Sequence, residues 1–108
     1  MEQRDKLILE ILALAYAVDR LTDFCVFIDY FGHVGSIDIE IAESKTRWQR
    51  KIATTEFYTD GRYQEDKDAP GMGWLAAKRD HLKQILDDHD IDVSEMTEHV
   101  EQTVQHWF

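Results

Sequence analysis

Residues 24–42, FCVFIDYFGHVGSIDIEIA, predict a β-hairpin, because they form two apolar runs joined by Gly32-His33-Val34-Gly35. If the turn is centred between His33 and Val34, each residue of the first run faces a defined residue of the second. A register shift by one residue would mix the two faces of such a hairpin and expose its isoleucines. The facing pairs on one side are then all apolar: Tyr30 with Ile37, Ile28 with Ile39, and Val26 with Ile41.

The opposite face of this hairpin carries acids. Asp29 is expected to face Asp38, and Glu40 is expected to face Phe27. Like charges directly opposite each other destabilise an antiparallel pair, so the two aspartates need an explanation. Three interpretations are open: neutralisation by a basic third strand, contact with a basic partner, or a metal held between the carboxylates. The basic residues that follow the hairpin are Lys45, Arg47, Arg50 and Lys51.

The segments around the hairpin predict an α+β fold. Residues 3–21 carry apolar side chains at helical spacing, and these are expected to pack deeply against the apolar face of the hairpin. Residues 49–59 favour a third antiparallel strand, with a short helix over 44–51 before a shorter strand as the alternative. The predicted helical stripe comprises Leu7, Ile11, Leu14, Val18 and Leu21, widened by Ile8, Leu12, Ala15 and Tyr16.

Two more helices are expected after a loop that contains Pro70. The first begins near Trp74 and ends in the acidic DDHD of residues 87–90. Asp92 and Glu95 have the spacing of a capping box, which predicts the start of a last helix. The chain is therefore predicted to be a single domain, 1–108. In it, an N-terminal helix packs on a three-stranded antiparallel meander that is followed by two C-terminal helices.

The composition restricts the partners. Asp and Glu number 22 and Lys and Arg number 12, which gives a formal net charge of -10. Such a surface repels nucleic acid and anionic membranes and attracts basic proteins. Cys25 is the only cysteine, so no internal disulfide is possible. With no apolar run long enough for a membrane span, the sequence predicts a cytoplasmic protein.

The C-terminal quarter concentrates negative charge. Residues 86–108 contain seven carboxylates and neither Lys nor Arg. Glu95, Glu98 and Glu101 step by three and so share one face of the predicted last helix. Carboxylate rows of this kind imitate a phosphate backbone, whereas the simpler interpretation is a solvated face. The residues expected to bind a partner are Asp87, Asp88, Asp90, Asp92, Glu95, Glu98 and Glu101, followed by Asp29, Asp38 and Glu40.

The sequence contains no motif for a cofactor or for catalysis. Its five histidines lack zinc-site spacing, and one cysteine does not make a thiolate cluster. The prediction is therefore a non-catalytic protein without a metal or cofactor. A small metal-dependent enzyme that uses His81 or His89 with neighbouring aspartates is the alternative in the enzyme class.

The pairing of MEQRDKLILEILALAYAV (1–18) with CVFIDYFGHVGSIDIEI (25–41) resembles small acidic proteins of unknown function carried by bacteriophages and prophages. The resemblance covers the first half of the chain. It implies a protein of the bacterial cytoplasm that binds and inhibits a basic host protein, as anti-CRISPR and DNA-mimic inhibitors do. A nucleic-acid-handling defence nuclease is the expected target. A structural or scaffolding homo-oligomer is the alternative outside the inhibitor class.

Overall fold

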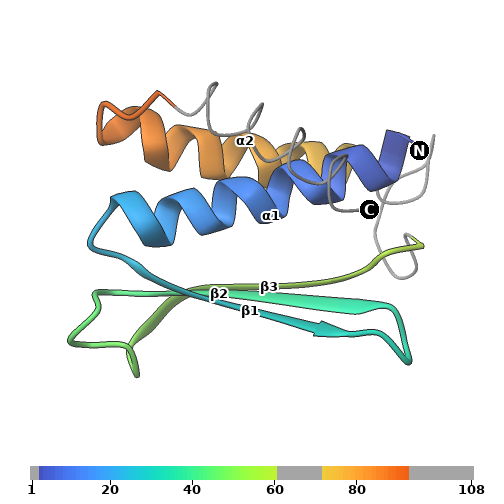
Figure 1. Ribbon diagram of the computed structural model, residues 1–108, viewed down its shortest axis with the longest axis horizontal. Coiled ribbons are helices and arrows are strands. Elements are labelled where there is room, and N and C mark those ends of the chain that lie inside the picture. The colour runs from blue at the N-terminus through green and yellow to red at the C-terminus, as the bar shows by residue number, and fades with distance from the viewer. Residues whose placement is uncertain (1–2, 61–71, 93–108) are drawn as a thin grey trace, which may run out of the picture.

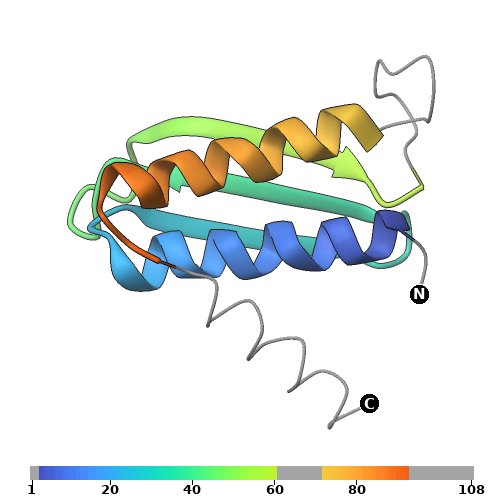
Figure 2. The same ribbon diagram turned by 90° about the horizontal axis from the view of Figure 1, so that it is seen from above.

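A computed structural model describes residues 3–60 and 72–92 of the chain. Both helices lie on one face of a three-stranded antiparallel sheet of order β1-β2-β3 (Figure 1). Helix α1 runs along the β1 side and α2 along the β3 side (Figure 2). The elements are α1 (Gln3–Leu21), β1 (Cys25–Phe31), β2 (Ser36–Ala42), β3 (Lys51–Tyr58) and α2 (Met72–Asp88). The α+β class, the meander and the first C-terminal helix are confirmed, while the predicted last helix lies outside the described residues.

Helix α1 begins and ends where its apolar periodicity predicts. Ile11, Leu14 and Val18 are fully buried against the sheet and α2. The predicted burial of Tyr16 and of Leu21 is wrong, since their side chains are 54% and 42% exposed. At about 100° per residue, Tyr16 falls on the flank of α1 that faces away from both the sheet and α2. Neither α1 nor α2 is long and apolar enough to cross a bilayer.

The hairpin has the predicted register in every pair, including Asp29 opposite Asp38. Its four-residue turn is closed by the N–H of Gly35, which donates to the carbonyl of Phe31 at 2.9 Å. Gly35 adopts φ 68°, a left-handed conformation that favours glycine. The isoleucines of β2 are buried, but Ile28 and Tyr30 on the same face of β1 are 40% and 66% exposed. This half of the expected core face is open because β1 is the edge strand.

Strand β3 confirms the strand interpretation of residues 49–59 over the helical alternative. The connection before it is a series of turns, in which the N–H of Arg47 donates to the Ser44 hydroxyl at 3.1 Å. A bulge at Ile41/Ala42 makes Ile52 an extra residue in the β2–β3 ladder, and its side chain is 54% exposed. The residues of β3 that face the helices are therefore Ala53, Thr55 and Phe57.

Asp19, near the end of α1, joins the helix to the sheet. Its Oδ1 accepts hydrogen bonds from the N–H of Val26 at 2.9 Å and from Nζ of Lys45 at 3.1 Å. Lys45 also donates to the carbonyls of Asp19 and Phe24. Burial by itself raises the pKa of the Asp19 carboxyl. The hydrogen bonds from Val26 and Lys45 and the Lys45 charge outweigh this effect, so the pKa of Asp19 lies below its usual value.

Helix α2 ends in a left-handed cap. The N–H of Ile91 donates to the carbonyl of Leu86 at 3.0 Å, which is the long bond of a Schellman motif. Asp90 occupies the position where glycine is usual, with φ 57°. The carboxylate also adds negative charge at the helix end where the macrodipole is already negative.

Replacing Asp90 by glycine is therefore expected to stabilise the protein by about 1 kcal/mol, because it removes both the backbone strain and the charge. Chemical denaturation followed by circular dichroism measures the effect. Asp90→Asn is the matched variant, since it removes the charge and keeps a residue that tolerates the left-handed conformation. A loss of stability in Asp90→Gly would contradict the assignment of the cap.

Candidate functional site

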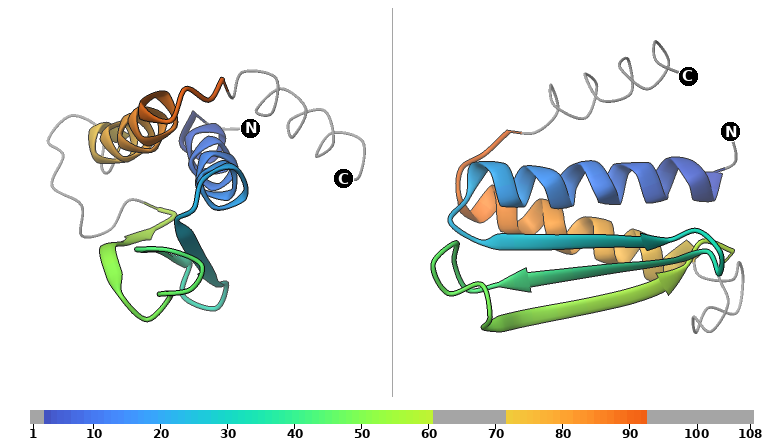
Figure 3. Two further views of the ribbon diagram at one scale, coloured as in Figure 1. Left: turned by 90° about the vertical axis from the view of Figure 1, so that its left-hand side faces the viewer. Right: turned by 60° about the horizontal axis from the view of Figure 1, so that its bottom comes forward.

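The face of the sheet that points away from α1 and α2 is the candidate site, and we call it the outer face. Figure 3 shows both helices on the opposite side of the sheet. The alternation of the strands places the buried isoleucines of β2 toward the helices and their neighbours on the outer face. The outer face comprises Phe27, Asp29 and Phe31 of β1, Ser36, Asp38 and Glu40 of β2, and Thr54, Glu56 and Tyr58 of β3.

Three carboxylates form a row across the middle of the outer face. Asp38 of β2 lies opposite Asp29 on one side and opposite Glu56 on the other. Neighbouring strands are about 4.8 Å apart, so the row is a close series of like charges. We call Asp29, Asp38 and Glu56 the acidic row.

The expectation that a basic third strand neutralises the aspartates is wrong, because β3 contributes Glu56. Lys45 is bound to Asp19 at 3.1 Å, and Lys51 lies 3.7 Å from Glu40. In the described part of the chain, no ion pair reaches the acidic row. The two arginines of the same segment, Arg47 and Arg50, lie 3.7 and 3.4 Å from Glu43.

Asp38 makes the acidic row less favourable still. Its Oδ1 is shielded from solvent, and no residue in the described ranges donates a hydrogen bond to it. A buried polar atom without a partner costs about 1 to 3 kcal/mol, more when the group is charged. A cation or hydrogen-bond donor arriving at the acidic row would offset both this cost and the repulsion between the strands.

Next to the acidic row, the chain provides a cation of its own. Nζ of Lys51 lies 3.7 Å from the ring centre of Phe27 and 3.7 Å from Glu40 Oε2. The indole of Trp48 meets the Phe27 ring edge-to-face at 6.5 Å. Nζ of Lys51 also donates to the Trp48 carbonyl at 2.8 Å, so Lys51 is held by this carbonyl together with one carboxylate and one aromatic face, a combination that favours ammonium and guanidinium groups.

The acidic row has aromatic neighbours as well. Phe31 is two residues from Asp29 on β1, and Tyr58 is two residues from Glu56 on β3. Residues two apart on a strand project from the same face of the sheet. Carboxylates and aromatic rings therefore lie close together at the acidic row, as Glu40 and Phe27 do around Lys51. No lysine or arginine of the described residues forms an ion pair with the acidic row.

The acids of the α2 end occupy a different place. Asp87, Asp88, Asp90 and Asp92 are exposed at the C-terminal end of α2, on the helical side of the sheet. Glu95, Glu98 and Glu101 lie outside the described residues. The structure therefore does not bring Asp87, Asp88, Asp90 and Asp92 together with Asp29, Asp38 and Glu40.

The two histidines of the enzyme alternative are also apart from the acidic row. His81 projects from α2 toward β3, and the ring of His89 meets Phe24 at 5.7 Å. Over residues 3–60 and 72–92, no group of three or more His, Cys, Asp or Glu side chains has a metal-binding arrangement.

Sequence reasoning found Asp29 and Asp38 but missed Glu56. Its place in the row depends on the register between β2 and β3. This register is not predictable from the sequence, because eight residues with turns connect the two strands and a bulge interrupts their pairing. The signal available in the sequence was Glu56 itself, an acidic residue that directly follows the strand-favouring Thr54 and Thr55. No protein-family model, curated protein or solved structure matches the chain.

Proposed function

We propose that the protein is a non-catalytic binding protein that takes up a lysine- or arginine-rich segment of another protein on its outer face. The observation that carries the proposal is the acidic row. Asp29, Asp38 and Glu56 lie side by side, and the described residues supply them with no cation. Beside them, Glu40 and Phe27 hold Lys51 in the manner expected for a partner's basic side chain.

Arginine suits the acidic row better than lysine does. Its planar guanidinium donates several hydrogen bonds in fixed directions, so one side chain is able to contact two neighbouring carboxylates. The exposed ring of Phe31 offers a surface on which the guanidinium stacks. The net charge of -10 adds long-range attraction that accelerates the encounter with a basic partner.

Inhibition of a nucleic-acid-handling protein is the form of this function that the chemistry favours. The channel of such a protein is basic because it binds phosphates. A compact acidic surface that enters the channel would compete with nucleic acid for the same lysines and arginines. Inhibition of a defence nuclease by a phage-type accessory protein belongs to this class, and we retain it as the proposed biological role.

Calorimetric titration with a short arginine-rich peptide tests the binding function. Raising the salt from 0.1 M to 1 M shortens the screening length from about 10 Å to about 3 Å, and we expect at least a tenfold loss of affinity. A peptide with glutamine at the arginine positions is the control and should not bind. An affinity that stays constant with salt would contradict the charge-based proposal.

Self-association is a second candidate function, favoured by one observation. Strand β1 is an edge of the sheet, and its Ile28 and Tyr30 are exposed on the helical side. A homo-oligomer formed through this edge would appear in light scattering as a mass that rises with concentration and is insensitive to salt. Ile28→Lys would reduce that mass to the monomer, whereas a monomer at all concentrations would exclude this candidate.

A further inference from the structure

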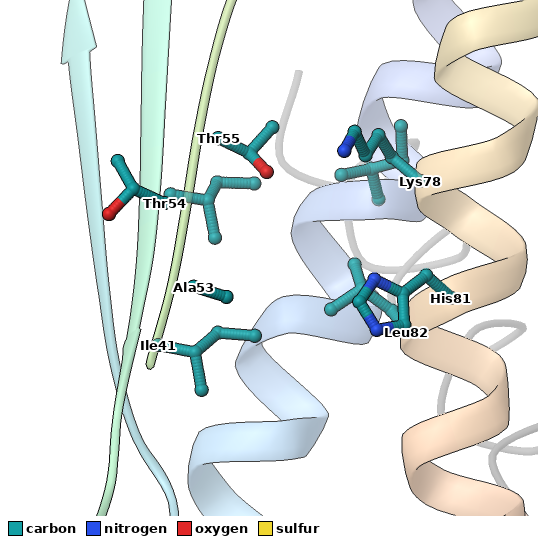
Figure 4. A pocket seen from close by; sticks show the side chains of 9 residues that line it. Ile41, Ala53, Thr54, Thr55, Lys78, His81 and Leu82 are labelled. Carbon is teal, nitrogen blue, oxygen red and sulfur yellow. The ribbon is translucent and has the colours of Figure 1, made fainter. Parts of the chain in front are cut away.

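A cavity of about 160 Å³ lies between α2 and β3, on the opposite side of the sheet from the acidic row. It is hollow because two residues that β3 contributes to its lining are small: Ala53 and Thr55 stand where β2 has Ile41 and Ile39. In Figure 4, the side chain of Thr55 points toward α2 and that of Thr54 points away from it.

The floor of the cavity is apolar. Ile11 of α1, Ile39 and Ile41 of β2 and Leu82 of α2 all contribute to it, and each is at least 94% buried. An enclosed cavity of about 150 Å³ that is lined only by leucine, isoleucine and phenylalanine accommodates benzene. The volume and the lining therefore suit an aromatic ring or a short branched aliphatic chain.

One wall of the cavity is polar and carries the ammonium group of Lys78. Lys78 and His81 extend from α2 toward β3 (Figure 4). Arg79 and Lys83 lie on the α1 side of the same helix, where they pair with Glu10 at 3.8 and 3.2 Å. Lys78 instead lies over the ring of Trp74 at 5.0 Å, and no carboxylate of the described residues is within ion-pair distance of it.

We propose that this cavity binds a small monocarboxylate whose body is aromatic or branched aliphatic. The apolar body would lie against Ile39 and Leu82, and the carboxylate would pair with Lys78 near the Thr55 hydroxyl. A neutral or cationic ligand of the same shape lacks the group that Lys78 attracts. This site lies on the other side of the sheet from the outer face. Failure of carboxylate binding would therefore leave the proposed binding of a basic partner unaffected, and the reverse is also true.

Methyl NMR of the full chain, titrated with benzoate, tests the proposal. We expect saturable shifts of the Ile39, Ile41 and Leu82 methyl signals, with a dissociation constant on the order of 0.1 to 1 mM for so small a ligand. Benzyl alcohol should bind about tenfold more weakly, since it forms no ion pair with Lys78. Benzylamine should not bind.

Two variants and one control locate the site. Lys78→Met keeps the length of the side chain and should weaken benzoate binding about tenfold. Ala53→Leu fills the cavity and should abolish the shifts. Lys83→Met removes the same charge on the α1 side of the helix and should bind as the wild type does. Absence of saturable shifts, equal binding of benzyl alcohol, or unchanged binding in Lys78→Met or Ala53→Leu would overturn the proposal.

Discussion

Replacing Phe57 by alanine should lower the free energy of unfolding by about 3 to 5 kcal/mol. Phe57 has no exposed surface, and its ring lies 5.7 Å from that of Trp74. It is the largest fully buried side chain among the described residues, and it packs where β3 meets α2. A domain of this size is stable by about 5 to 15 kcal/mol, so the variant should be partly unfolded or close to it.

Urea denaturation followed by circular dichroism measures this loss. Ile52→Ala is the control on the same strand, because the bulge leaves Ile52 exposed and its loss should cost less than about 0.5 kcal/mol. A similar small effect for Phe57→Ala would mean that α2 does not close the core over β3.

Neutralising the acidic row should reduce the affinity for an arginine-rich peptide at least tenfold. The triple variant Asp29→Asn/Asp38→Asn/Glu56→Gln keeps the shapes of the side chains and removes the three charges that we propose bind a partner. Each lost ion pair in a partly shielded site weakens binding by about 1 kcal/mol. The same variant should be more stable than the wild type by about 1 kcal/mol, since it removes repulsion between neighbouring strands.

The matched control for this variant is Asp87→Asn/Asp88→Asn/Asp90→Asn. It removes the same number of charges from the exposed end of α2, on the other side of the sheet. If general attraction to an acidic protein governs binding, the two triple variants will lose affinity equally. A larger loss in the α2 variant would move the contact surface to the helix end and contradict the assignment to the outer face.

Much of the fold was accessible from the sequence because its signals are local. The alternation in residues 25–42 and a short glycine-containing turn determine one register for the hairpin, which the structure confirms in every pair. The same logic failed for Ile28 and Tyr30. A strand pattern indicates which residues share a face, whereas their burial depends on how far α1 extends over the edge of the sheet.

The candidate site was accessible only in part. Asp29 and Asp38 follow from the hairpin, but Glu56 joins them through a register that the bulge at Ile41/Ala42 sets. The hydrogen bond from Lys45 to Asp19 was equally difficult to predict, since the two residues are 26 positions apart in sequence. The cavity arises from the space between two elements, so no single segment predicts it.

We propose that a basic partner binds on the outer face of the sheet. Amide NMR spectra recorded during titration with an arginine-rich peptide test it most directly. We expect the shifts to concentrate on Asp29, Asp38, Glu56 and their strand neighbours and to disappear at high salt. Shifts confined to the end of α2, at residues 87–92, would contradict it.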